Sequence, residues 1–131
     1  MKGNFAVQRN LWIDQDPVEK RATAIKRMSG RDVSMGVAVG PCRVIRKTED
    51  LHTLREGDIL VYRTGSPKIA AYLGRIAGLA TEVGGHLTNL GNCARECSVP
   101  YVAGVSGLMG EVRDGELMRV DGSGGTVDLL N

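Results

Sequence analysis

Short apolar runs separated by glycine-rich turns dominate the chain from residue 31 onward. Runs of this length, bounded by turn residues, are typical of buried or half-buried strands. The sequence predicts strands at 36–46, 58–62, 79–82, 101–105, 117–121 and 126–130. Gly36 and Gly40 allow a bulge or a close backbone approach within the first of these strands. A glycine-rich turn at 122–125 joins the last two strands.

A helical pattern precedes this region. Asp16 is a suitable N-cap, Pro17 suits the first helical position, and Glu19 completes a capping pattern. Apolar residues then recur at helical spacing through Ala22 and Ile25, so we expect a short amphipathic helix over about 17–28. Its apolar face is expected to dock on the rest of the domain.

Ser66 and Pro67 predict the start of a second helix, because proline is favoured at the first helical position. Its apolar residues, which would share one face, are Ile69, Leu73 and Ile76. Gly78 is expected to end this helix.

A third helix is expected at about 89–96, where Thr88 can act as the N-cap. The segment Ser98-Val99-Pro100 is expected to terminate it, because the residue before a proline disfavours the helical conformation.

Composition narrows the fold class. The 131 residues are 42% apolar and 24% charged, which is enough to bury one core. With one Phe, one Trp and 18 Gly, the core has to be built from aliphatic side chains between many tight turns. We therefore expect a mixed α/β domain over 31–131, preceded by a helical extension over 1–30.

Charge and hydropathy exclude several classes of function. The net charge of +2 is dispersed and forms no clustered basic run, so nucleic acid is not an expected partner. No apolar stretch approaches the length of about 18 residues that a membrane span needs. The N-terminus also lacks the apolar segment of a signal peptide. We expect a cytoplasmic protein that has no membrane partner.

The cysteines predict neither a disulfide framework nor a metal site. Cys42, Cys93 and Cys97 are an odd number without the spacing of a small secreted scaffold, so reduced thiols are expected. His86 would add a third ligand to Cys93 and Cys97, but the spacing His-x6-Cys-x3-Cys matches no familiar zinc site.

Several ordered blocks of sequence carry a more specific signal. These blocks are Gly57–Val61, Ser66-Pro67, Ala77–Gly85, Ala94-Arg95-Glu96, Val99–Val105, Asp114-Gly115-Glu116 and Val120-Asp121-Gly122. In this order they resemble the signature of the mobile phosphohistidine domain of phosphoenolpyruvate-utilising enzymes. That family includes phosphoenolpyruvate synthase, pyruvate phosphate dikinase and the first enzyme of the bacterial sugar phosphotransferase system. The resemblance covers roughly residues 30–131, and ordered blocks are far more specific than one glycine motif.

The resemblance implies a three-layer β/β/α swivelling domain. In the family, such a domain takes a phosphoryl group onto a histidine at one active site and moves bodily to a second site to deliver it. Since neither a nucleotide-binding domain nor a phosphoenolpyruvate-binding barrel is present, we expect separate subunits to bind phosphoenolpyruvate, ATP and Mg. The implied function is that of a stand-alone phosphocarrier in a split phosphoenolpyruvate synthase-like system.

One position departs from the family pattern. The family histidine follows Ser, Thr or Cys in Gly-Gly-x-x-[Ser/Thr/Cys]-His. The run 84–88, Gly-Gly-His-Leu-Thr, keeps this frame, but the next residue is Asn89. Neutral imidazole has a nitrogen lone pair that attacks phosphorus and forms a labile phosphoramidate. The lone pair of an amide nitrogen is delocalised, so Asn89 can hydrogen-bond a phosphate but cannot carry one.

The residues around Asn89 keep the design of an anion site. A helix that begins there would aim backbone N–H groups and its positive end at an anion. Gly84 and Gly85 supply the turn before it, Thr88 would add a hydroxyl, and Arg95 would add a guanidinium.

Two further residues bear on this site. Arg95 lies almost two turns into the helix, so an internal salt bridge with Glu96 or Glu82 is weighed equally with a phosphate contact. Leu87 stands where plant-type dikinases of the family have a regulatory threonine, so that type of control is not expected.

His86 is the substitute nucleophile that the sequence offers. Its side chain would lie about 5–6 Å from that of Asn89 if both residues were helical, but Gly84-Gly85 works against a helix there. In a loop, His86 could face solvent, a partner or the anion pocket, where it would accept a phosphoryl group or donate a proton. His52 lies in a connector without a motif and is expected to be a surface residue.

The sequence leaves three hypotheses open. In the first, the chain is a phosphocarrier in which His86 replaces the missing histidine. In the second, it is a non-catalytic binding or regulatory subunit that holds an anion or a partner at Asn89. In the third, Asn89 was introduced in place of a natural histidine. The run Leu90-Gly91-Asn92 also departs from the family's usual small apolar residues, which favours natural divergence over the third hypothesis.

Overall fold

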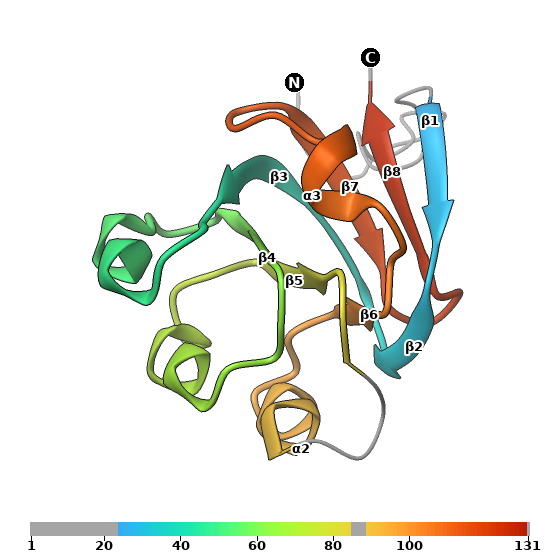
Figure 1. Cartoon of the computed structure of the whole chain (residues 1–131). Helices are drawn as coiled ribbons and strands as arrows, with labels where there is room; N and C mark the ends of the chain where they lie inside the picture. Colours follow the sequence, from blue (N-terminus) through green and yellow to red (C-terminus); the bar gives the residue numbers. More distant parts are fainter. Residues whose placement is uncertain (1–23, 85–88, 131) are drawn as a thin grey trace, which may run out of the picture.

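The computed structural model describes residues 24–84 and 89–130 (Figure 1). Its strands are β1 (Ala24–Ser29), β2 (Arg31–Ser34), β3 (Val37–Val44), β4 (Ile59–Tyr62), β5 (Gly78–Thr81), β6 (Tyr101–Ala103), β7 (Leu117–Asp121) and β8 (Thr126–Leu130). Its helices are the 3-10 helices η1 (Thr48–Thr53) and η2 (Pro67–Tyr72) and the α-helices α2 (Asn89–Glu96) and α3 (Leu108–Glu111). All six strands predicted from the sequence are confirmed. In chain order they correspond to β3 through β8.

Within the described residues, the strands form one eight-stranded sheet in the order β1-β8-β7-β3-β4-β5-β6-β2. Strand β3 belongs to both halves of this sheet. Its residues 37–41 pair antiparallel with β7, whereas its residues 42–44 pair parallel with β4. The parallel pairing continues from β4 to β5 and from β5 to β6. The sheet therefore divides at β3 into an antiparallel half and a mainly parallel half.

Side chains of the parallel strands alternate between two cores, as expected for a period of two. Ile59 and Val61 of β4 face a core shared with the antiparallel half, to which Met118 and Val127 also belong. The neighbouring Leu60 faces a second core under the helices. Residues that this second core takes from η1, from η2 with its C-cap, and from α2 are Leu51, Ile69, Leu73, Leu90 and Ala94.

Three layers result from the two cores. The antiparallel half of the sheet forms the first layer and the parallel half the second. The helices η1, η2 and α2 form the third, along one side of the parallel strands (Figure 1). The predicted β/β/α architecture is confirmed.

Gly30 lets the chain pass from one half of the sheet to the other. Gly30 is the single residue between β1 and β2. Strand β1 pairs with β8 at one end of the sheet, and β2 pairs with β6 at the other end. A Cβ atom on Gly30 would lie 2.4 Å from the carbonyl oxygen of Ala103 and 2.8 Å from Cγ2 of Val105. No side chain fits this crossing, so only glycine allows the two ends of the sheet to approach.

The helix predicted after Ser66 is present but shorter than expected. The Ser66 hydroxyl accepts a hydrogen bond from the Lys68 N–H at 3.2 Å, and η2 then ends at Tyr72. Its predicted apolar face is buried. Gly78 does not end this helix but begins β5, where a Cβ atom would lie 3.0 Å from Ile59 Cδ1. The glycine is therefore explained by close packing between strands.

The helix predicted over 17–28 is wrong where the structure describes it. Residues 24–28 belong to β1. Within the predicted helical extension over 1–30, the segment Ala24–Ser29 is therefore a strand and not a helix. The physical reason is pairing with β8, which satisfies the backbone of this segment. Ile25, assigned to the apolar face of the helix, is 62% exposed. Residues 17–23 lie outside the described residues.

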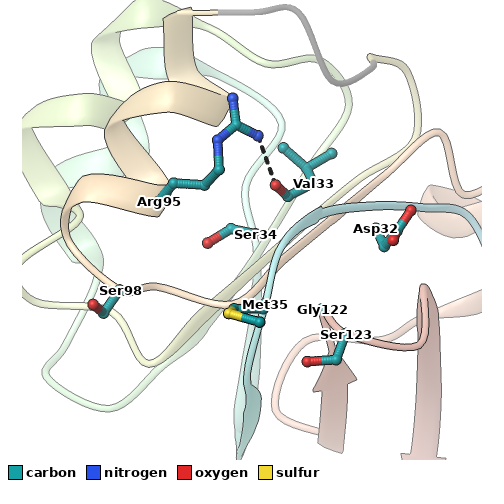
Figure 2. Close-up of a pocket in the computed structure, with 8 residues that line it drawn as sticks. All are labelled: Asp32, Val33, Ser34, Met35, Arg95, Ser98, Gly122 and Ser123. Atoms are coloured by element: carbon teal, nitrogen blue, oxygen red, sulfur yellow. Dashed lines mark hydrogen bonds between the residues drawn. The ribbon is translucent and has the colours of Figure 1, made fainter.

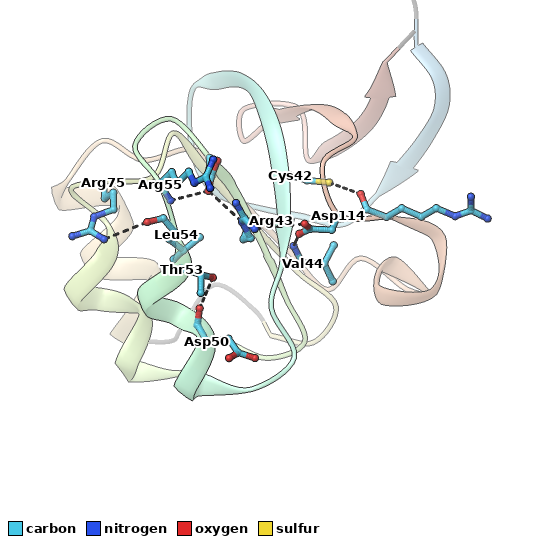
Figure 3. A network of polar contacts seen from close by, with 11 residues as sticks. Cys42, Arg43, Val44, Asp50, Thr53, Leu54, Arg55, Arg75 and Asp114 are labelled. Carbon is cyan, nitrogen blue, oxygen red and sulfur yellow. Dashed lines mark hydrogen bonds and ion pairs between the residues drawn. The ribbon is translucent and has the colours of Figure 1, made fainter.

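A polar network holds the turns that precede β4 and follow β3 (Figure 3). The Asp58 carboxylate is buried and accepts a hydrogen bond from the Arg55 N–H at 2.8 Å. Arg43 lies 3.6 Å from the carboxylates of both Asp58 and Asp114. Asp114 in turn accepts a hydrogen bond from the Val44 N–H at 2.8 Å. These contacts tie the start of β4 and the end of β3 to the loop that precedes β7.

A buried carboxylate connects the strands of the antiparallel half. Asp128 of β8 is 1% exposed. Its Oδ1 accepts a hydrogen bond from Arg27 Nε of β1 at 2.7 Å, and its Oδ2 accepts one from Arg119 Nη2 of β7 at 2.7 Å. The two guanidinium groups compensate a charge that burial alone would make unfavourable.

Asp128→Asn keeps the shape of the side chain but removes its charge. We expect the free energy of unfolding at neutral pH to fall by about 1.5–3 kcal/mol, the range for hydrogen bonds to charged groups. Urea unfolding followed by circular dichroism measures the change. Asp50→Asn, at an exposed carboxylate of η1, is the matched control and should change stability by less than about 0.5 kcal/mol. Equal effects of the two substitutions would contradict the assignment.

Asp128 also predicts a pH dependence. Hydrogen bonds from Arg27, assisted by Arg119, lower its pKa below the ordinary 3.8, while burial acts in the opposite direction. A carboxyl whose folded pKa is lowered contributes stability that is fully present well above pH 3.8 and is lost as pH falls through the folded pKa. Urea unfolding over a pH series should therefore show the gap between wild type and Asp128→Asn closing below pH 3.8. A gap that stays constant into acid would contradict this origin.

Candidate functional site

The carboxyl ends of β4, β5 and β6 lie at one edge of the parallel half of the sheet, which is where ligands bind in open α/β sheets. β5 ends at Thr81 and is followed by the described segment 82–84. Helix α2 begins at Asn89, which is exposed, and packs its Leu90 into the core under the helices. The predicted helix over 89–96 is confirmed, and Asn89 is its first residue.

Two buried hydroxyl groups lie beneath the loops at this edge of the sheet. Thr81 Oγ1 and Tyr101 Oη lie 3.0 Å apart and are hydrogen bonded. Burial raises the pKa of the Tyr101 hydroxyl, and the hydrogen bond with Thr81 opposes this shift. Cβ atoms placed on Gly65 and Gly84 would lie 3.2 and 3.5 Å from Tyr101 Oη. Because neither glycine has a side chain, the loops that follow β4 and β5 can place their backbones against this uncharged hydroxyl pair.

Gly84 has a backbone conformation that requires glycine. Its φ of +139° lies in a region that L side chains rarely adopt. Gly104, after β6, has a φ of +67°, and a Cβ atom there would lie 3.3 Å from the Gly84 carbonyl oxygen. The loops after β5 and β6 therefore approach each other through glycine backbone.

The segment after β5 is held from two sides. The Val83 N–H donates to the Arg63 carbonyl oxygen at 2.8 Å, which joins this segment to the loop after β4. Glu82 Oε1 accepts a hydrogen bond from the Met109 N–H at 2.9 Å, in the first turn of α3. Gly84 is consequently positioned by contacts that do not involve α2.

Arg95 lies at the opposite end of α2 from Asn89, about 9 Å along the axis at a rise of about 1.5 Å per residue. Its Nη1 donates to the Val33 carbonyl oxygen of β2 at 2.7 Å, and its Nη2 donates to Asn92 Oδ1. These contacts direct its guanidinium toward β2. The phosphate contact of Arg95 and its alternative, a salt bridge with Glu96 or Glu82, both stay predictions.

The remaining predicted residues divide into two groups. Gly85, His86 and Thr88 lie outside the described residues, so their roles stay predictions. His52 is exposed in η1, and its Nδ1 lies 2.6 Å from the Glu49 carbonyl oxygen. This local contact agrees with the surface position expected for His52.

Sequence reasoning missed two residues at this edge. Tyr101 stands inside an apolar strand run, and its hydroxyl gave no signal of a partner 20 positions away. Arg31 is exposed, and its Nε lies 3.7 Å from where a Cβ atom on Gly104 would be. Its cation therefore lies beside the glycine that contacts Gly84, which only the β2–β6 pairing reveals.

Within residues 24–84 and 89–130, no group of three or more His, Cys, Asp or Glu side chains could hold a metal ion. Cys42 is buried, its Sγ lies 3.0 Å from the Arg113 carbonyl oxygen, and burial raises its thiol pKa to about 11. A thiol with this pKa is neutral near pH 7 and is a poor nucleophile.

None of the helices in the described part of the chain is long and apolar enough to span a membrane.

Three layers, with a helix terminus set beside the carboxyl ends of parallel strands, define a swivelling β/β/α domain. The family model described as "PEP-utilising enzyme, mobile domain" matches residues 54–125. The chain belongs to this family.

Two relatives and one solved structure illustrate the similarity. A rifampicin phosphotransferase of Bacillus cereus is 41% identical over 101 residues, which cover 77% of this chain and 12% of the relative. A probable phosphoenolpyruvate synthase of Archaeoglobus fulgidus is 30% identical over 113 residues, which cover 86% of this chain and 15% of the relative. A solution structure of Enzyme I (nEIt) is 31% identical with a TM-score of 0.52, over 60% of this chain and 32% of that chain.

The matched segment spans less than a sixth of either relative's length. In phosphoenolpyruvate-utilising enzymes this domain is thus one part of a larger assembly of domains.

Gly84→Ala tests the backbone of the site. The alanine would be forced into a strained φ, and we expect a loss of about 1–3 kcal/mol in the free energy of unfolding. Gly74→Ala is the matched control, because a Cβ atom there meets no atom within 4 Å, and it should change stability by less than about 1 kcal/mol. Chemical denaturation measures both variants, and a Gly84→Ala effect as small as the control would show that this backbone is unstrained.

Proposed function

We propose that this chain is a phosphoryl-transfer module of a phosphoenolpyruvate-utilising system and works with separate subunits. Those subunits would bind ATP, Mg and phosphoenolpyruvate. The observation that carries the proposal is the family match over residues 54–125. The similar proteins named above, a phosphotransferase and a probable phosphoenolpyruvate synthase, support it.

The local geometry supports an anion at the N-terminal end of α2. The first N–H groups of a helix have no partner within the helix, and its positive dipole end favours negative charge. Exposed Asn89 stands at this end and can donate its amide N–H to a phosphoryl oxygen. Arg31 is exposed and its Nε lies near Gly104, so we assign it the electrostatic role that was predicted for Arg95.

The carrier role needs a nucleophile other than Asn89. We assign it to His86, the histidine of the Gly84–Thr88 run. In the forward step, an imidazole nitrogen of His86 forms an N–P bond while the P–O bond to the donor breaks, and the departing oxygen keeps the electron pair. Delivery reverses this step with the acceptor's oxygen as the attacking atom.

Asn89 favours a second candidate function. An amide at the family's histidine position leaves a site that can bind an anion or a partner surface without accepting a phosphoryl group. In that case the chain is a binding or regulatory subunit of the same system.

Phosphoryl labelling separates the two functions. Wild type, His86→Ala, His52→Ala and Asn89→His would each be incubated with labelled phosphoenolpyruvate or ATP and the partner subunits. Mass spectrometry of the peptide spanning residues 76–95 would then locate an acid-labile, base-stable label. For the carrier function we expect wild type and His52→Ala to be labelled at His86 and His86→Ala to lose the label, because imidazole is the attacking group.

The Asn89→His variant tells the outcomes apart. An unlabelled wild type together with a labelled Asn89→His would show that the partners recognise the domain but that the natural chain carries nothing. That result overturns the carrier function and supports the binding function. Label retained in His86→Ala would remove His86 from its assigned role.

A further inference from the structure

A groove of about 480 Å³ lies beside the C-terminal end of α2 (Figure 2). Strand β2, the end of α2 and the turn between β7 and β8 form its walls. Hydroxyl groups reach it from all three walls, from Ser34, Ser98 and Ser123. Arg95 lies above them, and its guanidinium is directed toward Val33 (Figure 2).

Ser34 is the most informative residue of the groove. It is 3% exposed, and its hydroxyl has no hydrogen-bond partner among residues 24–84 and 89–130. A buried hydroxyl without a partner is unfavourable, because it has given up water and gained nothing in exchange. Figure 2 shows its oxygen directed toward the α2 side of the groove. An acceptor atom of a ligand would satisfy this donor.

The other walls also present donors. Ser123 Oγ accepts a hydrogen bond from the Gly36 N–H at 2.9 Å, which leaves its own proton to be donated elsewhere. Ser98 is exposed and has a φ of +58°, the left-handed conformation that glycine usually occupies at the end of a helix. Serine occupies this conformation, and Ser98 lines the groove.

Negative groups also lie near the groove. The carbonyl oxygens at the end of α2 accept backbone hydrogen bonds, since the Ser98 N–H donates to Arg95 and the Val99 N–H donates to Ala94. The Asp32 carboxylate lies across the groove from Arg95 in Figure 2, and Asp32 has an interaction partner of its own.

We propose that this groove binds a small oxyanion, a phosphate or a carboxylate, with the Ser34 hydroxyl and the Arg95 guanidinium as its principal donors. The volume exceeds that of a bare phosphate, and Val33 and exposed Met35 supply apolar surface for the carbon atoms of an organic acid. Free phosphate and a small organic acid share the chemistry that this site recognises. The site lies at the other end of α2 from Asn89, so it is separate from the phosphoryl-transfer role proposed above.

Amide NMR titration of the full chain tests the site. Inorganic phosphate, pyruvate and phosphoenolpyruvate would be added separately at constant ionic strength. We expect saturable shifts at the amides of Ser34, Ser98 and Ser123. A tighter complex with pyruvate or phosphoenolpyruvate than with phosphate identifies an organic acid as the ligand, and equal or tighter phosphate binding identifies free phosphate.

The variants make the test specific. Ser34→Ala removes one oxygen from a buried site, and Arg95→Gln removes the charge; each should weaken binding by about tenfold or more, the factor that corresponds to about 1.4 kcal/mol. Ser106→Ala, at an exposed serine outside the groove, should leave binding unchanged. An amide spectrum that overlays on wild type in the absence of ligand shows that each variant is folded.

Three outcomes would overturn the proposal. The first is the absence of saturable shifts in the groove. The second is equal binding by wild type and Ser34→Ala when the latter is folded. The third is a set of shifts confined to Gly84 and Asn89, which would place the anion at the proposed phosphoryl-transfer site and leave the groove without a ligand.

Discussion

Burial of β4 and β5 on both faces is the constraint on which the rest of the structure depends. Every residue of these two strands is buried, and parallel strands of this kind need a covering layer on each side. The antiparallel half of the sheet covers one face and the helices cover the other. Close packing follows, as at Gly40, where a Cβ atom would lie 2.4 Å from the Gly57 carbonyl oxygen. Polar chemistry is thereby confined to the ends of the strands and to the loops.

This constraint explains how much of the fold the sequence could predict. Buried strands are continuous apolar runs, so β4 and β5 are visible in the local pattern, and so is the apolar face of Ile69 and Leu73. Strand β1 is not visible, because its conformation is decided by pairing with β8, about a hundred residues away in the chain. The same distance separates Arg27 from Asp128, and no local pattern reveals a buried carboxylate with partners on two other strands.

The candidate site shows the same difference between local features, which can be predicted from the sequence, and contacts between distant residues, which cannot. The start of α2 at Asn89 and the strained turn at Gly84 are local features, and the sequence located both. The place of Arg95 is not local, because its contact with the Val33 carbonyl oxygen joins residues 62 positions apart. The Ala-Arg-Glu run left a phosphate contact and an internal salt bridge equally open for this guanidinium, and its contact with β2 could be found only from the tertiary structure. The contribution of Gly85, His86 and Thr88 rests on sequence alone.

The frame of the site is independent of the group that would react there. Gly84 is set by its own φ and by backbone contacts, and the Thr81–Tyr101 hydroxyl pair is fixed within the sheet. Replacing the exposed Asn89 side chain at the first position of α2 is therefore expected to cost the fold little. Retention of the fold is consequently no evidence for retention of the chemistry. Helix α2 is anchored on the core through Leu90 and Ala94, so the packing that holds it is separate from the side chains exposed at its two ends.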